Sequence, residues 1–239
     1  MSGRFSIAID GPAGAGKSTV ARGVARLLGY RYIDTGAMYR AVTLLALEEN
    51  ININDTETLC KLVKNAIIDI IDNNDKGTTV LLNGVDVSEK VRGPLVTKYV
   101  SDVSKVSGVR SVLVNSQRKM AVSGGVVMEG RDIGTAVLPE AEYKFYIIAS
   151  AQERAKRRAR DFENMGLTVD LDQLTEDIQK RDFIDSSREI NPLRPAEDAK
   201  IIDCTGMSAE EVIRELVAII TEGRSLCSTD SPGLYAEHI

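Results

Sequence analysis

Short apolar runs rich in β-branched residues alternate along the chain with stretches whose apolar side chains recur at helical spacing. The runs predict buried strands, and recurrence every three to four residues predicts helices with one apolar face. The strands are expected at residues 5–10, 30–33, 125–128, 144–148 and 201–203. The helices are expected at residues 17–28, 37–49, 109–122, 151–165, 170–185 and 208–221. Strands alternating with helices indicate a parallel sheet covered on both faces.

One segment in the first half of the chain departs from this alternation. Three short apolar runs follow each other there, at residues 67–71, 79–82 and 85–87. Asn83-Gly84, between the last two runs, is a strong signal for a two-residue hairpin. Because such a meander is antiparallel, we expect residues 51–93 to be an insertion into the α/β core.

The 239 residues are expected to form a single domain, with residues 1–50 and 94–222 as its core. The predicted fold class is a three-layer α/β/α P-loop fold with a five-stranded parallel sheet, a small antiparallel insertion and a helical lid at residues 152–168. Residues 223–239 are polar and punctuated by turn residues, so we expect a flexible tail.

Composition narrows the class of protein. Hydrophobic residues make up 43% of the chain, enough for one sizeable core, yet no run reaches the roughly 18 apolar residues of a membrane span. The first residues lack a signal-peptide pattern, so a cytoplasmic protein is expected. Three scattered cysteines and a single histidine, His238, argue against a zinc site or a Ser-His-Asp hydrolase. A net charge of −5 argues against nucleic acid as a partner.

The clearest motif follows the first predicted strand. Residues 11–18 fit the pattern GxxxxGK[ST] between a strand and a helix, the context of a phosphate-binding loop. Backbone N–H groups and the helix dipole would hold the phosphates, Lys17 would reach the β- and γ-phosphates, and the Ser18 hydroxyl would bind Mg²⁺. The residues expected to bind ATP here are Gly11, Pro12, Ala13, Gly14, Ala15, Gly16, Lys17, Ser18 and Thr19.

A phosphate-binding loop alone does not separate switches, motors and kinases. A GTPase switch needs a guanine-reading NKxD box, which the sequence lacks, and its DxxG at residues 203–206 lies on the last predicted strand. The length argues against a large motor. A small-molecule kinase is favoured, and a nucleotide-dependent binding switch remains the alternative.

Cations gather where the predicted strands end. Arg40 lies one turn into the second helix, and the strand at residues 125–128 leads into Arg131 and Asp132. Open α/β sheets bind ligands at the carboxyl ends of their strands, so these side chains are expected in one crevice. Each arginine alone is also consistent with a solvated surface charge.

The helix at residues 151–165 carries Arg154, Arg157 and Arg158 on one face. Like charges this dense repel each other unless an anion lies among them, so we expect a lid that brings arginines onto the transferring phosphates. A nucleic-acid patch and a solvated helix are the alternatives, although no aromatic residues interleave to stack bases. Arg181, Asp185 and Arg188 follow at spacings of four and three, which a simple intrahelical ion pair would also explain.

The charges suit a particular acceptor. Phosphorylating an alcohol usually requires a base, whereas the phosphate of a nucleoside monophosphate has its second pKa near 6 and is already ionised. Such a reaction needs cations, and the expected catalytic residues are Lys17, Arg131, Arg157 and Arg158. Asp10 or Asp34 would suit a base for an alcohol, so a sugar or shikimate-type kinase remains an alternative.

Four segments together resemble the bacterial cytidylate kinases: IDGPAGAGKST, DTGAMYR, EGRDIGT and RDxxDSSR, starting at residues 9, 34, 129 and 181. The resemblance extends over about residues 4–220, and the antiparallel insertion is similar to that of the longer bacterial form. It implies a monomeric nucleoside monophosphate kinase that uses ATP and Mg²⁺ to convert CMP and dCMP to CDP and dCDP.

The resemblance also implies roles for individual residues. Ser101, Arg110 and Asp132 would read the cytosine ring, whose amine a carboxylate accepts and whose N3 and O2 a guanidinium binds. Uracil places an oxygen against Asp132, and an unpaired buried group costs roughly 1–3 kcal/mol. Arg40 and Arg131 match positions that hold the acceptor phosphate, and Arg157 matches a position that binds ATP. Three residues match positions near the sugar and base: Arg181, Asp185 and Arg188. Thr35 matches a substrate-binding position where serine is common.

Overall fold

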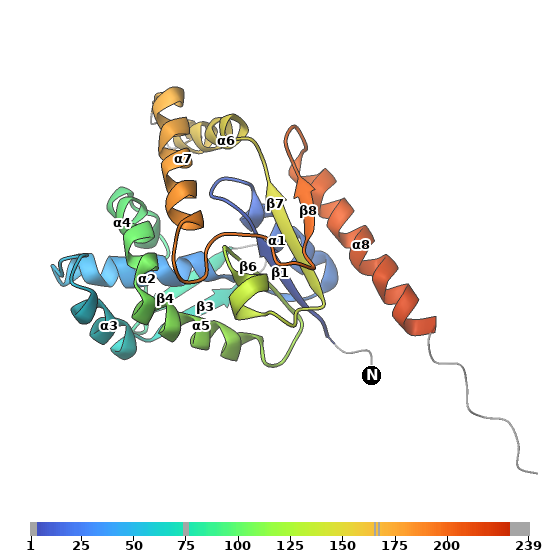
Figure 1. Ribbon diagram of the computed structural model, residues 1–239, viewed down its shortest axis with the longest axis horizontal. Coiled ribbons are helices and arrows are strands. Elements are labelled where there is room, and N and C mark those ends of the chain that lie inside the picture. Colours follow the sequence, from blue (N-terminus) through green and yellow to red (C-terminus); the bar gives the residue numbers. More distant parts are fainter. Residues whose placement is uncertain (1–3, 74–76, 165, 167, 230–239) are drawn as a thin grey trace, which may run out of the picture.

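The computed structural model describes residues 4–73, 77–164, 166 and 168–229. Its centre is a five-stranded, all-parallel sheet in the order β2-β6-β1-β7-β8 (Figure 1). The strands are β1 (Ser6–Asp10), β2 (Arg31–Asp34), β6 (Val126–Gly130), β7 (Tyr143–Ile148) and β8 (Lys200–Asp203). The predicted fold class and the five predicted strands are confirmed.

Helices cover both faces of this sheet because successive residues of each strand point to opposite sides. Ile7 and Ile9 of β1 pack in one core with α1 (Lys17–Leu28) and α8 (Ala209–Thr229). Ala8 between them belongs to another core, with α5 (Ser107–Ala121) and a short π-helical turn, η3 (Ile133–Val137). The remaining helices are α2 (Thr35–Glu48), α3 (Thr56–Asn65), α4 (Pro94–Lys105), α6 (Ala151–Asn164) and α7 (Leu171–Ser186).

The antiparallel meander is also confirmed. β3 (Ile68–Asp72), β4 (Thr78–Leu82) and β5 (Val85–Asp86) form a three-stranded antiparallel sheet. Asn83 and Gly84 both have positive φ angles, 50° and 81°, as a type I′ hairpin turn requires. The small sheet joins the edge of the large one, since the Asp72 carboxylate accepts the Tyr32 N–H of β2 at 2.9 Å.

Two helices flank this small sheet where the apolar pattern had indicated none. α3 begins at Asp55, whose carboxylate accepts the Thr58 N–H, and α4 begins with Pro94 in its first turn. Both pack against α2 in the core cluster that contains Leu59 and Val100. No helix among the described residues is long and apolar enough to span a membrane.

The last helix runs further than the pattern predicts. α8 continues to Thr229, so residues 223–229 of the expected tail are helical, and residues 230–239 lie outside the described residues. Gly223 does not end the helix, since its φ angle is not positive, and it packs against Tyr143, where a Cβ would lie 2.6 Å from the hydroxyl. That hydroxyl donates to the Ile220 carbonyl oxygen, which fixes α8 to β7.

The bond between the two sheets generates a stability prediction. Asp72→Ala removes the acceptor of the Tyr32 N–H, so the free energy of unfolding should fall by about 1–2 kcal/mol. Asp72→Asn keeps an acceptor oxygen at that place and should cost less than half as much. Urea denaturation followed by circular dichroism measures both changes, and equal losses in the two variants would contradict the importance of this bond.

Candidate active site

The loop between β1 and α1 is shaped by glycines. Gly11, Gly14 and Gly16 have φ angles of 145°, 77° and 90°, which L side chains rarely adopt. A Cβ at position 11 would lie 2.0 Å from the Ile147 carbonyl oxygen on β7, so only glycine lets the loop pass this close to the sheet. α1 begins directly after the loop with its unpaired backbone N–H groups, an arrangement suited to hold an anion.

Lys17 lies inside this loop at an electrostatic cost. Its side chain is buried, and its Nζ donates to the Pro12 carbonyl oxygen at 2.7 Å. Burial and the nearby Arg131 guanidinium lower the pKa of the amine to about 7, against the opposite effect of Glu129. An anion that binds beside such a destabilised cation lowers the free energy of the site.

Four arginines predicted for the site lie around the same space. Burial, followed by the proximity of Arg131, lowers the pKa of Arg181 to about 9, with Arg40 and Arg158 adding to the shift. Burial also lowers the pKa of Arg40, and Arg158 and Arg131 contribute. Arg131 and Arg181 also lower the pKa of Lys17, so we call Lys17 and the four arginines together the cation cluster.

The RDxxDSSR segment reaches the cluster from α7. Asp185 is buried and its carboxylate pairs with Arg131 at 3.1 Å, across from the end of β6. The pKa of Asp185 lies below its usual value because Arg131, Arg181 and Arg188 outweigh the effect of burial. Asp185 is therefore bound to a residue of another element, and the simple intrahelical ion pair considered above is not what the segment forms.

A second, fully buried ion pair lies beside the cluster. Arg110 of α5 is 1% exposed and pairs with the Asp132 carboxylate at 2.5 Å. The Tyr39 ring lies against the guanidinium, 5.2 Å from its carbon, and the Ser104 carbonyl oxygen accepts another of its N–H groups. Ser101, one turn earlier on α4, is buried as well. Such a pair leaves fixed donors and acceptors for a small polar ring.

Carboxylates mark the ends of the neighbouring strands β2 and β6. Asp34 caps α2 by accepting the Ala37 N–H at 3.1 Å, and Thr35 donates its hydroxyl to the Glu129 carbonyl oxygen. The buried Glu129 carboxylate accepts the Tyr32 hydroxyl. Burial and the nearby Asp34 raise the pKa of Glu129, while Lys17 and the Ser18 hydroxyl act the other way. Hydroxyl and carboxylate oxygens therefore meet at the opening of the phosphate-binding loop.

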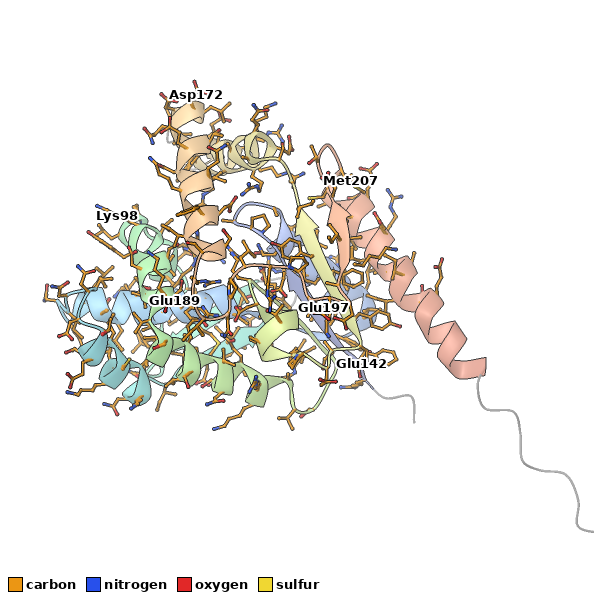
Figure 2. The ribbon with its side chains drawn as sticks, in the orientation of Figure 1. Lys98, Glu142, Asp172, Glu189, Glu197 and Met207 are labelled. Carbon is orange, nitrogen blue, oxygen red and sulfur yellow. The ribbon has the colours of Figure 1, made fainter. Side chains whose placement is uncertain are left out.

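Three of the four arginines of α6, the ones predicted to share one face, make different contacts. Arg154 donates to the Ala13 carbonyl oxygen and pairs with Asp182 of α7 at 2.7 Å. Arg157 donates to the carbonyl oxygens of Ala15 and Cys204, toward the β8–α8 loop where Figure 2 labels Met207. The Arg158 guanidinium lies over the Phe162 ring, 5.1 Å from its centroid, and its charge helps to lower the pKa of Arg40 and of Arg181. Arg157 is thus bound to the backbone of two loops, and the catalytic roles of Arg157 and Arg158 stay predictions.

Sequence reasoning missed several residues that shape this site. Asp10 was considered only as a base, yet both its oxygens accept backbone N–H groups, from Ile133 and Gly134. Tyr39 and Gln117 are buried beside Arg110. Gln117 lies seven residues after Arg110 on α5, and a polar residue on the apolar face of a predicted helix was the signal available for it.

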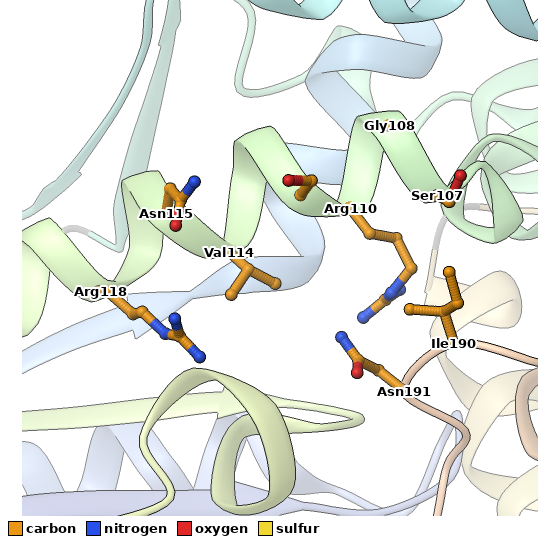
Figure 3. A pocket seen from close by; sticks show the side chains of 9 residues that line it. Ser107, Gly108, Arg110, Val114, Asn115, Arg118, Ile190 and Asn191 are labelled. Carbon is orange, nitrogen blue, oxygen red and sulfur yellow. The ribbon is translucent and has the colours of Figure 1, made fainter.

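A groove opens on the outer side of the buried ion pair (Figure 3). It has a volume of about 450 Å³ and lies between α5 and the segment after α7. Figure 3 shows Arg110 and Asn191 at one end and Arg118 at the other. The guanidinium of Arg118 donates to the carbonyl oxygens of Ala136 and Val137 and so holds η3 against α5.

Comparison with known proteins gives a consistent result. The model of the family described as "Cytidylate kinase" matches residues 7–222. A cytidylate kinase of Desulforamulus reducens is 55% identical over 224 residues, which are 94% of this chain and 100% of that protein. A cytidylate kinase of Bacillus cereus is 50% identical over 221 residues, which are 92% of this chain and 98% of that protein. The solved structure of a gluconokinase from Sinorhizobium meliloti 1021 aligns with 95% of this chain and 99% of its own chain, with a TM-score of 0.48 and 15% sequence identity.

The pKa of Lys17 generates a prediction for the ligand-free protein. It is about 7 in the folded state and 10.5 as a model value, so between these pH values the unfolded chain binds more protons. Stability should therefore rise with pH, by about 1–2 kcal/mol from pH 7 to about pH 9. Urea denaturation at several pH values measures this rise.

Lys17→Met is the matched variant, since it keeps the length of the side chain without the amine. The rise should be largely lost in it. An equal rise in both proteins would contradict the lowered pKa.

Proposed function

The chain belongs to the cytidylate kinase family, and we propose how its residues divide the work of that activity. It transfers the γ-phosphoryl group of ATP to CMP and dCMP, giving ADP with CDP and dCDP. The cation cluster is the observation that carries the proposal, because a direct in-line transfer brings two highly charged phosphates together.

Charge neutralisation is the main catalytic task. In a site shielded from water, like charges a few ångströms apart repel by several kcal/mol. We propose that the phosphate-binding loop and Lys17 hold the β- and γ-phosphates, and that Arg40 and Arg131 hold the acceptor phosphate. Arg158 and Lys17 then stabilise the charge on the group in flight. Residues 11–19 also bind the rest of the triphosphate, with Arg157 fixing the loop behind it.

The acceptor phosphate needs no base, since its oxygen is already ionised. The two carboxylates that would suit an alcohol acceptor are engaged elsewhere. Both oxygens of Asp10 accept backbone N–H groups, and Asp34 caps α2. These contacts support a phosphate acceptor over the sugar or shikimate-type alternative.

The buried pair of Arg110 and Asp132 is proposed to select the base. Asp132 accepts the amine of cytosine, and Arg110 donates to its ring acceptors, with Ser101 completing the contact. Because Arg110 is held by Tyr39 and the Ser104 carbonyl oxygen, it does not reorganise for uracil. Uracil would place an oxygen against Asp132 and leave a buried acceptor unpaired.

The sugar side is assigned to α7. Arg181, Asp185 and Arg188 lie next to Arg131, so the contacts to the pentose are continuous with those to the phosphate. Thr35 is proposed to line the acceptor site beside Glu129. Hydrogen bonds from several groups at the end of α7 and just after it tolerate the loss of one ribose hydroxyl, which fits the use of both CMP and dCMP.

Mg²⁺ is the proposed metal, with the Ser18 hydroxyl as its ligand. Oxygen donors at this opening, Ser18 and the Glu129 carboxylate behind it, suit a hard cation that keeps several of its waters. When bound, the ion offsets charge on the β- and γ-phosphates.

The insertion at residues 51–93 is proposed to be the NMP-binding part of the protein, and residues 152–168 are proposed as a lid that excludes water. We further propose a monomer that acts in the cytoplasm without nucleic acid, in line with its net charge of −5.

A panel of acceptors tests the activity. Purified protein with ATP and Mg²⁺ should release ADP rapidly with CMP and dCMP, more slowly with UMP, and little with AMP, GMP or shikimate. Equal rates with CMP and UMP would remove the proposed base selection and keep the kinase. Tight nucleotide binding without turnover of any acceptor would instead support a binding switch.

The division of labour on α6 gives a mutational prediction. Arg158→Met should lower kcat by about 10²–10³-fold with little change in the KM for either substrate, because the contact forms with the transferring group. Steady-state kinetics of ADP release measures both constants.

Variants of two neighbouring residues on the same helix serve as controls for Arg158→Met. Lys156→Met removes an exposed cation and should change kcat by less than about twofold. Arg157→Met should mainly raise the KM for ATP, since Arg157 holds the loop. A larger loss of kcat in Arg157→Met than in Arg158→Met would reverse the assignment.

A further inference from the structure

The turn that carries Arg131 and Asp132 has an unusual cap. η3 begins at Ile133, and the first N–H groups of a helical turn have no partner within it. Asp132 occupies the preceding position, from which an aspartate ordinarily accepts such N–H groups with its own carboxylate. Its carboxylate makes no cap bond here and is instead bound by Arg110 at 2.5 Å.

Asp10 provides the missing acceptors from a distant part of the chain. It is the last residue of β1, directly before the phosphate-binding loop, and is only 4% exposed. Its Oδ1 accepts the Ile133 N–H at 2.8 Å, and its Oδ2 accepts the Gly134 N–H at 2.7 Å. Both oxygens are thus committed to the turn.

The position of the Asp10 carboxylate is electrostatically unfavourable. Burial raises the pKa of Asp10 to about 7, the two N–H groups lower it, and the neighbouring Asp132 raises it again. Two acidic side chains therefore lie near each other, one capping the turn and the other holding Arg110. One carboxylate, that of Asp10, is enough to cap the turn, so the Asp132 carboxylate is available for a different contact.

We propose that Asp10 is a positioning residue for base selection: it caps η3 in place of Asp132 and so leaves the Asp132 carboxylate free for Arg110 and cytosine. The inference rests on the proposed role of Asp132. It also joins the two substrate sites, because the residue that ends the ATP-side strand fixes the turn on which the base is read.

Competition between the two carboxylates distinguishes this role from simple structural support. When Asp10 loses acceptor capacity, Asp132 is already at the capping position and can turn back to its own N–H groups. The pair with Arg110 is then weakened, and cytosine loses its advantage over uracil. A general loosening of the fold would affect both substrates alike.

The test compares kcat/KM for CMP and UMP in Asp10→Asn, Asp132→Asn and the double variant. Both acceptors carry the same phosphate, so contributions of the cation cluster cancel in the CMP-to-UMP ratio. Asp10→Asn, which keeps the side-chain shape and one acceptor, should lower this ratio by about tenfold. In the Asp132→Asn background it should change the ratio by less than about twofold, because the residue acts through Asp132.

Asp170→Asn is the matched control, since the Asp170 carboxylate also accepts two backbone N–H groups at a helix start, those of Asp172 and Gln173. The CMP-to-UMP ratio of kcat/KM in Asp170→Asn should equal that of the unaltered protein. Circular dichroism checks folding, and Asp10→Ser, which keeps an acceptor oxygen in less volume, replaces Asp10→Asn if that variant does not fold.

Two failures are distinguishable. If Asp132→Asn lowers the ratio and Asp10→Asn leaves it unchanged or lowers both rate constants equally, the inference on Asp10 is wrong and the proposed base selection stands. If Asp132→Asn itself leaves the ratio unchanged, the proposed role of Asp132 fails, and the inference fails with it.

Discussion

The repulsion among buried positive charges is the constraint around which the site is built. Lys17, Arg40 and Arg181 each lose part of their ordinary basicity to burial and to the other cations. Only a stable scaffold holds such groups together without an anion, and here it is a parallel sheet whose strand ends meet at one edge. The carboxylates of Asp185 and Glu129 reduce the repulsion without filling the place of a phosphate.

Around this cluster, the acidic residues are arranged so that each has a separate task. Asp34 caps a helix, Asp185 holds Arg131, and Asp132 holds Arg110. Asp10 binds backbone alone, and by doing so connects the phosphate-binding loop to the turn after β6. These contacts engage the acidic side chains named here, all within the described part of the chain, and so suit an acceptor that arrives already ionised.

Much of this architecture was predictable from local pattern, because β1 and α1 are bounded by glycines and by a change of apolar period from two to 3.6. α3 and α4 were missed, although apolar residues recur at helical spacing in both, at Leu59, Leu62 and Val63 and at Val96, Val100 and Val103. In the site, motif spacing placed Lys17, Arg40 and Arg131 together. It did not separate Arg157 from Arg158 or give Asp10 its partners, because those contacts join residues more than a hundred positions apart.

The first turn of α6 is tied to the phosphate-binding loop through Arg154 and Ala13, which would make this attachment the pivot of the proposed lid. Arg158, four residues on, lies about 6 Å along the helix axis from it. A rotation of about 20° there would displace the backbone of Arg158 by about 2 Å, and that of Asn164, about 15 Å from Arg154 at the end of the helix, by about 5 Å. A movement of the proposed lid that is wide at its tip would therefore change the position of Arg158 only a little.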